Sequence, residues 1–382
     1  MKIALISPNY MAASETWIWR QIEYMKPWLT VIATFQTPQQ NNYVGIPIKH
    51  LDKLPGLKER IKRKITKESY NRQINLQNNL LTLNKSTGFD TLYIHFLTTA
   101  YQLKDYLKRC DKRVLIHCHG YDVTWDLKQL AYPYLPAHPS DYVDFVLSIK
   151  DRVTFIANSQ ATARQLNKIG IDNQHIKTLL FGIKECSLSK AQATNEKTPL
   201  SILFLGRLVD CKGPHKTIFA FEAASSKGLN AELTIAGDGP LLTTVRLLAN
   251  NSPYKERIKV LGPVSYEQGN ILRSKASIFT THNMTGELTG QEEAYGVAFL
   301  EAMAAGLPIV TGKSGGLTET IIDGETGLFF EPGNIDQHAA LLLDLANNPE
   351  KRSRLGRNGI KHIQKNFNFQ IEQAMFNDIL KA

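Results

Sequence analysis

The sequence has few cysteines and no long apolar run, and each shortage excludes a class of protein. No stretch approaches about 18 consecutive apolar residues, so no membrane-spanning helix is expected. The apolar start, MKIALISPNY, is interrupted by Pro8 and lacks a small-residue cleavage site, which predicts a buried strand rather than a signal peptide. The cysteines show neither metal-ligand nor C-x-x-C spacing, which favours reduced thiols in a cytosolic protein, at Cys110, Cys118, Cys186 and Cys211.

Acidic residues are scarce in the first half of the chain. The 382 residues hold 45 Lys and Arg against 35 Asp and Glu, a net charge of +10. Residues 1–190 have a net charge of +11, and the remaining residues have a net charge of −1. The excess of positive charge is densest in Leu57–Lys67. This segment could attract anionic lipid head groups or a phosphate-bearing acceptor; the alternative is a solvated helix face. No aromatic residue interleaves with this segment, so nucleic acid is not an expected partner. We expect a cytoplasmic protein, with a peripheral contact at the inner membrane face if the segment Leu57–Lys67 attracts lipid.

Short apolar runs alternate with longer polar-patterned segments along the chain. Strands that alternate with helices predict parallel sheets with helices on both faces. In the first half we expect strands at Ile3–Ser7, Leu29–Ala33, Thr91–His95, Val114–Cys118, Phe145–Ser148 and Thr154–Asn158. In the second half we expect them at Leu200–Leu205, Ala231–Ala236, Ile258–Leu261, Ile278–Thr281, Pro308–Thr311 and Gly327–Phe330.

A polar stretch, Ser187–Thr198, separates the two halves and is typical of a linker. A chain of this length, 43% hydrophobic, is expected to form two cores. The predicted fold class is α/β, with two doubly wound Rossmann-like domains, 1–190 and 199–365, facing each other across a cleft. The apolar spacing near the end predicts a closing helix within residues 366–382. Ligands of such domains bind at the carboxyl ends of the strands.

The segment Glu292–Val310, EEAYGVAFLEAMAAGLPIV, is the most informative in the chain. It predicts a helix over Val297–Ala305 that starts near Gly296. The unpaired N–H groups and the positive dipole end of such a helix suit a phosphate group. Glu293 and Glu301 can both face a ligand that lies across the helix start, where carboxylates accept hydrogen bonds from vicinal hydroxyls. The alternative is a surface glutamate at each position.

Two cations follow the expected strand Leu200–Leu205. Arg207 and Lys212 suit a diphosphate, because arginine offers a bidentate fork and lysine a point charge, although surface loops often carry both residues. A second glycine turn, Leu233–Pro240, is not a dinucleotide fingerprint, because Leu242 stands where G-x-G-x-x-G requires glycine. This turn either shapes a nucleotide pocket or is purely structural.

The expected strand Val114–Cys118 continues into the sequence His-Gly-Tyr-Asp. This places the imidazole of His119 and the carboxylate of Asp122 at the carboxyl edge of the sheet, which favours a site there. His95, which ends another expected strand, is expected to have a structural role beneath that site.

In this order the motifs resemble glycosyltransferase family 4, retaining enzymes of the GT-B fold, and within it the bacterial surface-polysaccharide members. The resemblance covers nearly the whole chain and is strongest over about residues 200–335. The E-x7-E signature matches at Glu293 and Glu301, and the G-R-L…K-G segment at Gly206, Arg207, Lys212 and Gly213. Further matches are the G-D-G-P turn, Leu261-Gly262 with Val264-Ser265, Gly315-Gly316…Glu319, Asp323-Gly324…Thr326-Gly327, His119-Gly120 with Asp122, Asn158-Ser159 and Ser14-Glu15-Thr16.

The resemblance implies that domain 1–190 binds the acceptor and domain 199–365 the nucleotide sugar. Arg207 and Lys212 are implied to hold the donor diphosphate, and Glu301 the ribose hydroxyls. Glu293 and His119 are implied to act at the transferred sugar. Further donor contacts are implied for the backbone at Val264, Tyr295, Gly296 and Val297, and acceptor contacts for Ser14 and Asp122.

The resemblance also implies transfer with retention and with no cofactor or metal. No D-x-D motif stands at an expected strand end, which disfavours a metal-held donor. By family frequency a uridine diphosphate sugar is the first expected donor and guanosine diphosphate mannose the second. The expected acceptor is a glycan or a lipid-linked saccharide in polysaccharide biosynthesis. Tyr295 replaces the usual Phe of the family, and its hydroxyl is expected to change the sugar preference.

Three other functions remain open at this point. A nucleotide-sugar epimerase of the same fold would turn over the donor without an acceptor. A catalytically silent binding subunit would not need to keep both glutamates and both cations. A Rossmann dehydrogenase is disfavoured because the dinucleotide fingerprint fails.

Overall fold

The computed structural model describes residues 1–9, 16–36, 42–43, 45–52, 72–126, 138–183 and 199–381. Ser14, the basic segment Leu57–Lys67 and the expected linker Ser187–Thr198 lie outside the described residues. Contacts divide the chain into two compact units. The first comprises Met1–Val123, Pro139–Ala157 and Ala163–Thr178, and the second Thr124–His138, Asn158–Thr162 and Leu179–Ala382.

The first unit is built on an eight-stranded sheet with the order β3-β4-β2-β1-β5-β6-β7-β8. Every pair is parallel except β3 with β4. The strands are β1 (Ile3–Ser7), β2 (Leu29–Thr34), β3 (Asn42–Tyr43), β4 (Ile46–His50), β5 (Thr91–His95), β6 (Arg113–Cys118), β7 (Thr154–Ala157) and β8 (Ile176–Thr178). All residues of β1 and β5 are buried, as expected for parallel strands covered on both faces.

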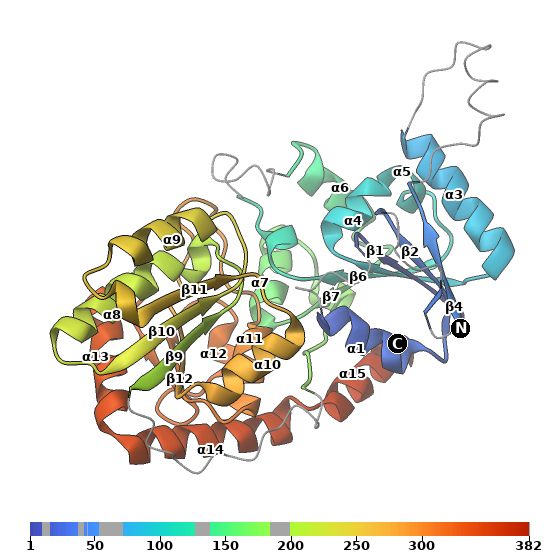
Figure 1. Ribbon diagram of the computed structural model, residues 1–382. Coiled ribbons are helices and arrows are strands. Elements are labelled where there is room, and N and C mark those ends of the chain that lie inside the picture. The colour runs from blue at the N-terminus through green and yellow to red at the C-terminus, as the bar shows by residue number, and fades with distance from the viewer. Residues whose placement is uncertain are drawn as a thin grey trace. The chain divides into compact units, whose positions relative to one another are not determined.

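Helices cover both faces of this sheet. In Figure 1, α4 and α6 lie on one face and α1 on the other, which is the doubly wound arrangement. The helices described in this unit are α1 (Thr16–Met25), α3 (Arg72–Thr87), α4 (Leu97–Gln102), α5 (Lys104–Leu107) and α6 (Tyr142–Ile149), and α7 (Gln160–Lys168) begins at the boundary between the units.

The expected strand Phe145–Ser148 is wrong, because these residues lie inside α6. The buried side chains of α6 are Tyr142, Phe145, Val146 and Ile149, which repeat with the three-to-four-residue period of a helix. A short apolar run by itself does not distinguish a buried strand from a buried helix turn.

The second unit is built on a six-stranded sheet with the order β11-β10-β9-β12-β13-β14, in which all pairs are parallel. Its strands are β9 (Leu200–Leu205), β10 (Ala231–Ala236), β11 (Ile258–Gly262), β12 (Ile278–Thr281), β13 (Ile309–Gly312) and β14 (Gly327–Phe330). Its helices are α8 (Pro214–Ser226), α9 (Leu242–Asn251), α10 (Tyr266–Lys275), α11 (Val297–Ala304), α12 (Leu317–Thr320), α13 (Ile335–Asn347), α14 (Pro349–Asn366) and α15 (Phe369–Lys381). The core joins fully buried residues of β9, α8 and α13, among them Phe204, Phe221 and Leu342.

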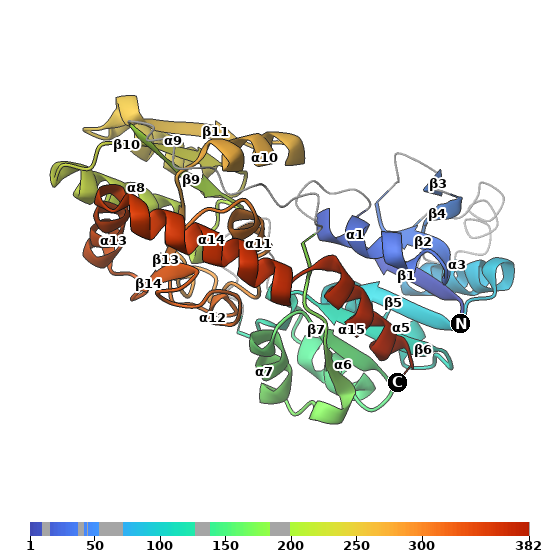
Figure 2. The same cartoon turned by 90° about the horizontal axis from the view of Figure 1, so that it is seen from below.

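The long helix α14 passes in front of α11 in Figure 2 and packs closely against the end of that helix. A Cβ atom at Gly356 would overlap the carbonyl group of Gly306, and one at Gly359 would lie 3.3 Å from the Met303 side chain. These glycines of α14 allow the close approach that holds α11 in place. No helix in the described part of the chain is both long and apolar enough to cross a membrane.

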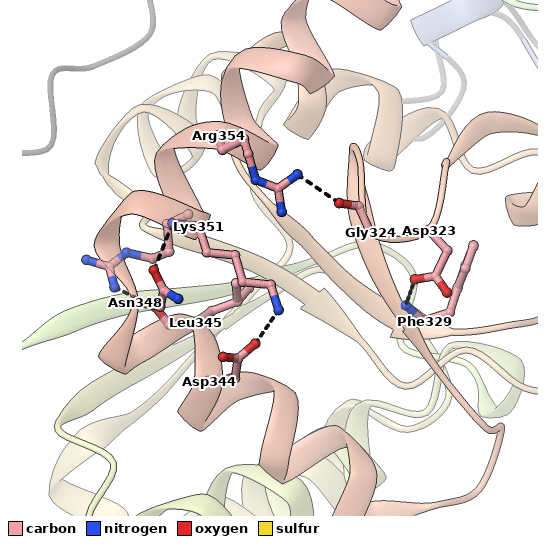
Figure 3. A network of polar contacts seen from close by, with 9 residues as sticks. Asp323, Gly324, Phe329, Asp344, Leu345, Asn348, Lys351 and Arg354 are labelled. Carbon is pink, nitrogen blue, oxygen red and sulfur yellow. Dashed lines mark hydrogen bonds and ion pairs between the residues drawn. The ribbon is translucent and has the colours of Figure 1, made fainter.

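Polar contacts fix the start of α14 and the turn before β14 (Figure 3). The Asn348 side chain caps α14 by accepting a hydrogen bond from Lys351 N at 3.0 Å. Arg354 donates to the carbonyl of Gly324 at 3.1 Å, and Asp323 accepts from Phe329 N at 3.0 Å. The Asp-Gly…Thr-Gly motif therefore has a structural role in the turn that leads into β14.

Two buried histidines of the second unit form a chain of hydrogen bonds that requires both to be neutral. Gly333 N donates to His282 Nε2 at 3.1 Å, so the proton of His282 is on Nδ1. That nitrogen lies 3.1 Å from His338 Nδ1, and His338 Nε2 lies 2.7 Å from Thr280 Oγ1. Burial, with the charges of Lys216 and His215, lowers the pKa of His282 to about 3. Burial, then His282, holds the pKa of His338 well below its ordinary value.

We predict that acid destabilises the protein through this pair. An unfolded histidine binds a proton near pH 6.5, so below that pH the unfolded state holds more protons than the folded state. Stability should be complete above about pH 6.5 and fall as the pH drops toward 3, by about 1.4 kcal/mol per pH unit for each neutral histidine. Urea unfolding at pH 7, 6 and 5 measures this slope. His338→Gln should make the slope shallower, and an unchanged slope in that variant would contradict the assignment.

Candidate active site

The loops that follow β9, β10 and β11 are joined by backbone hydrogen bonds at the carboxyl edge of the second sheet. Gly206 N donates to Ala236 O at 3.1 Å, and Gly237 N donates to Gly262 O at 2.8 Å. Gly237 has a φ of +140°, and a Cβ atom there would overlap the Gly206 carbonyl oxygen. The turn Leu233–Pro240 thus has a structural role, because its glycine lets the loop after β9 lie directly beside it.

The loop after β9 brings Lys212 to Glu293. Lys212 Nζ lies 2.5 Å from Glu293 Oε2, and the two side chains are 12% and 13% exposed. Burial acts to raise the pKa of the Glu293 carboxyl. The charge and hydrogen bond of Lys212, the charge of Arg207 and a backbone hydrogen bond from Tyr295 outweigh it, so this pKa lies below its ordinary value. Glu293 is therefore an anion that the two expected cations stabilise.

Arg207 is the exposed member of this group. Its charge lowers the pKa of Glu293 and acts in the same direction on that of Cys211. Within the described ranges no residue forms a hydrogen bond or an ion pair with its guanidinium. The group therefore presents one exposed cation beside a lysine–carboxylate pair, an arrangement that can bind an anion with a neighbouring hydroxyl.

Glycine contacts position Glu293 at the start of α11. Gly316 N donates to the Glu293 carbonyl at 2.8 Å, and a Cβ atom at Gly316 would overlap the carbonyl of Ala294. Gly296 precedes α11 with a φ of +84°, a conformation that favours glycine. The N–H groups of Val297 and Ala298 lack partners within the helix, whereas Phe299 N donates to the Gly296 carbonyl at 2.9 Å. The helix start thus lies within a few residues of the carboxylate, as the sequence predicts.

Tyr295 forms two hydrogen bonds within the protein. Its hydroxyl is buried and donates to the Phe181 carbonyl at 2.9 Å, so the protein itself uses this hydroxyl, and its expected effect on sugar preference stays a prediction. The buried hydroxyl forms this hydrogen bond within the protein, because burying a hydroxyl group without a hydrogen-bond partner costs free energy. Its backbone N–H bonds to the Glu293 carboxylate. That N–H orients Glu293 in this conformation.

Glu301 meets a cation that the sequence did not single out. Its Oε2 lies 3.1 Å from Arg273 Nη1, and the two side chains are 11% and 5% exposed. Arg273 comes from α10 and Glu301 from the second turn of α11. No sequence signal distinguishes Arg273 from the other basic residue of its segment ILRSK, Lys275.

Asp210 holds the loop between β12 and α11. Its carboxylate accepts hydrogen bonds from Leu288 N and Thr289 N, both at 2.9 Å, and from the Thr289 hydroxyl. Asp210 is buried in the short turn that ends at Lys212, so one turn fixes both this loop and the lysine. No local pattern in the sequence distinguishes Asp210 from other acidic loop residues.

His119 lies in the first unit, in a group of rings at the carboxyl ends of β5 and β6. Its ring centroid is 4.2 Å from Trp17, 4.5 Å from Phe96 and 4.3 Å from His117. Burial, then His117 and His95, holds the pKa of His119 well below its ordinary value, so its ring is neutral. His95 is fully buried, and its Nδ1 lies 3.3 Å from His119 Nε2. The position of His95 agrees with the structural role expected for it.

Asp122 has a structural role in place of the expected acceptor contact. It is fully buried. Its Oδ1 accepts from His119 N and Gly120 N at 2.8 and 2.9 Å, and its Oδ2 accepts from Leu97 N at 2.8 Å. Burial raises its pKa to about 6, although these hydrogen bonds act in the opposite direction. The backbone uses both oxygens, so Asp122 fixes the His-Gly loop. It also supports the residue before Leu97, Phe96, whose φ of +69° is unusual for a non-glycine residue.

Val264 is half-buried and lies two residues before α10. Ser265 and Gln268 form a capping box at the start of that helix. The backbone at Val264 is thereby fixed between β11 and α10. Ser14, by contrast, lies outside the described residues.

Among the described residues one group has metal-ligand character. Ring nitrogens of His95, His117 and His119 lie within 4.8 Å of one another. One nitrogen of His117 already bonds to the Tyr93 hydroxyl at 2.8 Å. The three described cysteines, Cys110, Cys118 and Cys211, form no disulfide.

Comparisons with known proteins agree on one enzyme class. A family model described as glycosyl transferases group 1 matches residues 187–362, which contain Arg207, Lys212, Glu293 and Glu301. A GDP-mannose-dependent alpha-(1-6)-phosphatidylinositol monomannoside mannosyltransferase of Mycobacterium tuberculosis is 26% identical over 272 residues, 71% of this chain and 70% of that protein. The capsular polysaccharide biosynthesis glycosyltransferase CapM of Staphylococcus aureus is 27% identical over 245 residues, 62% of this chain and 58% of that protein.

Solved structures share the fold over the whole chain. Anabaena HepE in complex with UDP-glucose superposes with a TM-score of 0.77 at 16% identity, covering 100% of both chains. Sucrose-phosphate synthase from Thermosynechococcus elongatus gives 0.77 at 15% identity, covering 100% of this chain and 98% of that one. The chain thus has the two parallel-sheet units of the GT-B fold, matches the glycosyl transferases group 1 model over residues 187–362, and is a glycosyltransferase.

Proposed function

We propose that this glycosyltransferase moves a sugar, with retention and without a metal, from a nucleotide diphosphate sugar to a glycan or lipid-linked saccharide. The observation that carries the proposal is the group formed by exposed Arg207 and the Lys212–Glu293 pair beside the start of α11. Two cations and a helix N-terminus suit a diphosphate, and an ionised carboxylate beside them suits the hydroxyls of the sugar attached to it.

In this proposal the bond between the anomeric carbon and the donor phosphate breaks while the acceptor oxygen bonds to the same face of that carbon. Negative charge develops on the departing diphosphate, where Arg207, Lys212 and the N–H groups of α11 stabilise it. The departing phosphate oxygen takes the proton of the acceptor hydroxyl. Glu293, already ionised by its pairing with Lys212, holds hydroxyls of the transferred sugar. The contact of His119, a neutral imidazole of the first unit, with a sugar stays a prediction from the resemblance.

The relatives favour guanosine diphosphate mannose as the donor to test first. Proteins named for this donor are 26% identical over 71% of the chain, whereas the structures holding uridine diphosphate are similar at 16% identity and so inform the fold. A uridine diphosphate sugar, the first expectation from family frequency, is the second donor to test. The same relatives act on a phosphatidylinositol mannoside, which supports a lipid-linked acceptor.

Nucleotide binding tests the proposal directly. Melting temperatures are measured with GDP, UDP, GDP-mannose and UDP-glucose, in EDTA and without added metal. A ligand at about 100 times its dissociation constant should stabilise the folded protein by about 2.7 kcal/mol. Arg207→Ala and Glu293→Ala should then greatly reduce transfer. The absence of any shift, or near-normal turnover in both variants, would remove the site assignment.

A further inference from the structure

Arg273 and Glu301 form a buried ion pair that the proposed chemistry does not itself require. Arg273 Nη1 lies 3.1 Å from Glu301 Oε2, with side chains only 5% and 11% exposed. Arg273 Nη2 donates to Asn270 Oδ1 at 2.6 Å. The guanidinium is thus held at one side by its own helix and at the other by the carboxylate of α11.

The helix that carries Arg273 is well fixed. The capping box of Ser265 and Gln268 satisfies its first backbone groups. A Cβ atom at Gly269 would be in ordinary van der Waals contact, 3.7 Å from Arg273 Nη1 and 3.4 Å from the Leu205 side chain at the end of β9, so the guanidinium and β9 both lie close to this face of α10. The arginine therefore enters a space bounded by β9, α10 and α11.

Stability alone does not explain this pair. Replacing a buried ion pair by well-packed apolar residues is often neutral or stabilising, because both charges lose hydration. A buried charge pair is useful where one partner must remain ionised and hold one orientation for a ligand. Glu301 is such a group if it accepts hydrogen bonds from the two ribose hydroxyls of the donor.

We propose that Arg273 is a positioning residue that makes the site selective for a ribonucleotide. Arg273 binds one oxygen of Glu301 and sets the plane of that carboxylate, so that the carboxylate accepts from the vicinal 2′- and 3′-hydroxyls. This inference rests on the proposed function, because it assigns the same carboxylate to the nucleotide ribose. It adds a residue on a different helix that acts through Glu301.

The test compares GDP with 2′-deoxy-GDP, and UDP with 2′-deoxy-UDP, by calorimetry on the full chain. Wild-type protein should bind the ribonucleotide more tightly than the deoxynucleotide. Arg273→Gln should weaken ribonucleotide binding by about 10- to 100-fold, the range expected for hydrogen bonds to a charged group. Binding of the deoxynucleotide should weaken by a clearly smaller factor, because it keeps only one of the two hydroxyls that Glu301 is proposed to hold. Glu301→Gln should show the same pattern.

Two further variants separate positioning from a general loss of structure. Asn270→Ala removes only the second partner of the guanidinium and should give a smaller loss of the same selectivity. Arg257→Lys is the matched control, since Arg257 of the same unit donates to the Leu229 carbonyl and lies over the Tyr254 ring. It should leave the ratio of the two affinities unchanged.

The outcomes distinguish this inference from the proposed function. Equal weakening of both nucleotides by Arg273→Gln, or no weakening of either, overturns the role of Arg273. If Glu301→Gln removes the selectivity and Arg273→Gln does not, the inference fails while the proposed function stands. If the wild-type protein binds no nucleoside diphosphate, the proposed function itself fails.

Discussion

Lys212→Met is expected to lower kcat/KM for sugar transfer by about a thousandfold. Removing a single group that stabilises developing charge typically costs about 10²- to 10³-fold in rate. Two interactions are lost here, because Lys212 faces the diphosphate in the proposed mechanism and also lowers the pKa of Glu293. Without the lysine, burial acts on Glu293 with less opposition and raises its pKa. A carboxyl that binds a proton more readily is a poorer acceptor of hydrogen bonds from the sugar.

Initial rates over a range of donor concentrations measure this effect in wild-type protein and the variant. Lys259→Met is the control, since Lys259 pairs with Glu232 on the exposed surface of β10 and β11, and it should retain wild-type kinetics. The double variant Lys212→Met with Glu293→Gln should lose little more than the worse single variant, because the two side chains act as one unit. Activity within a few-fold of wild type in Lys212→Met would show that the pair has no part in transfer.

Gly237→Ala is expected to lower the free energy of unfolding by about 3 kcal/mol or more and to abolish nucleotide binding. The added Cβ atom would overlap the carbonyl oxygen of Gly206, and the φ of +140° is strained for any side chain. The loops after β9 and β10 must move apart to remove that overlap. The loop after β9 carries Arg207 and Lys212, so the site is disturbed together with the fold.

Gly228→Ala separates the two causes of this loss. Gly228 also has a positive φ, of +97°, but a Cβ atom there would have no heavy atom within 4 Å. It should lose only about 1 kcal/mol, from backbone strain alone. Urea unfolding of both variants gives the comparison. Equal losses would mean that the conformation of the backbone, and not the close approach of the two loops, limits stability at Gly237.

The sequence by itself determined most of the architecture. Runs such as Ile3–Ser7 and Leu200–Leu205 are continuous, apolar and bounded by turn residues, and they form buried parallel strands with the expected bounds. It failed at Phe145–Ser148, where four residues are too few to reveal the helical period that α6 shows. It also missed the short strands β3, β4 and β8, because two to five partly polar residues carry no clear alternation.

The sequence also located the residues of the candidate site, because helix starts and strand ends are local features. Gly296 before an apolar helix and Gly206 after an apolar strand can be recognised without knowing what lies nearby. Lys212 and Glu293 were both identified in this way, as residues at separate chain positions.

Only the tertiary structure decided which groups meet. β9 pairs with β10 and β12, and this order brings a loop from one part of the chain to a helix start about 80 residues later. Arg273 was missed because a buried arginine and an exposed one have the same sequence pattern on a short helix. Asp122 and Tyr295 were assigned to ligands, although backbone groups from distant segments occupy their polar atoms. Such pairings depend on contacts between residues far apart in the chain, and local periodicity contains no information about them.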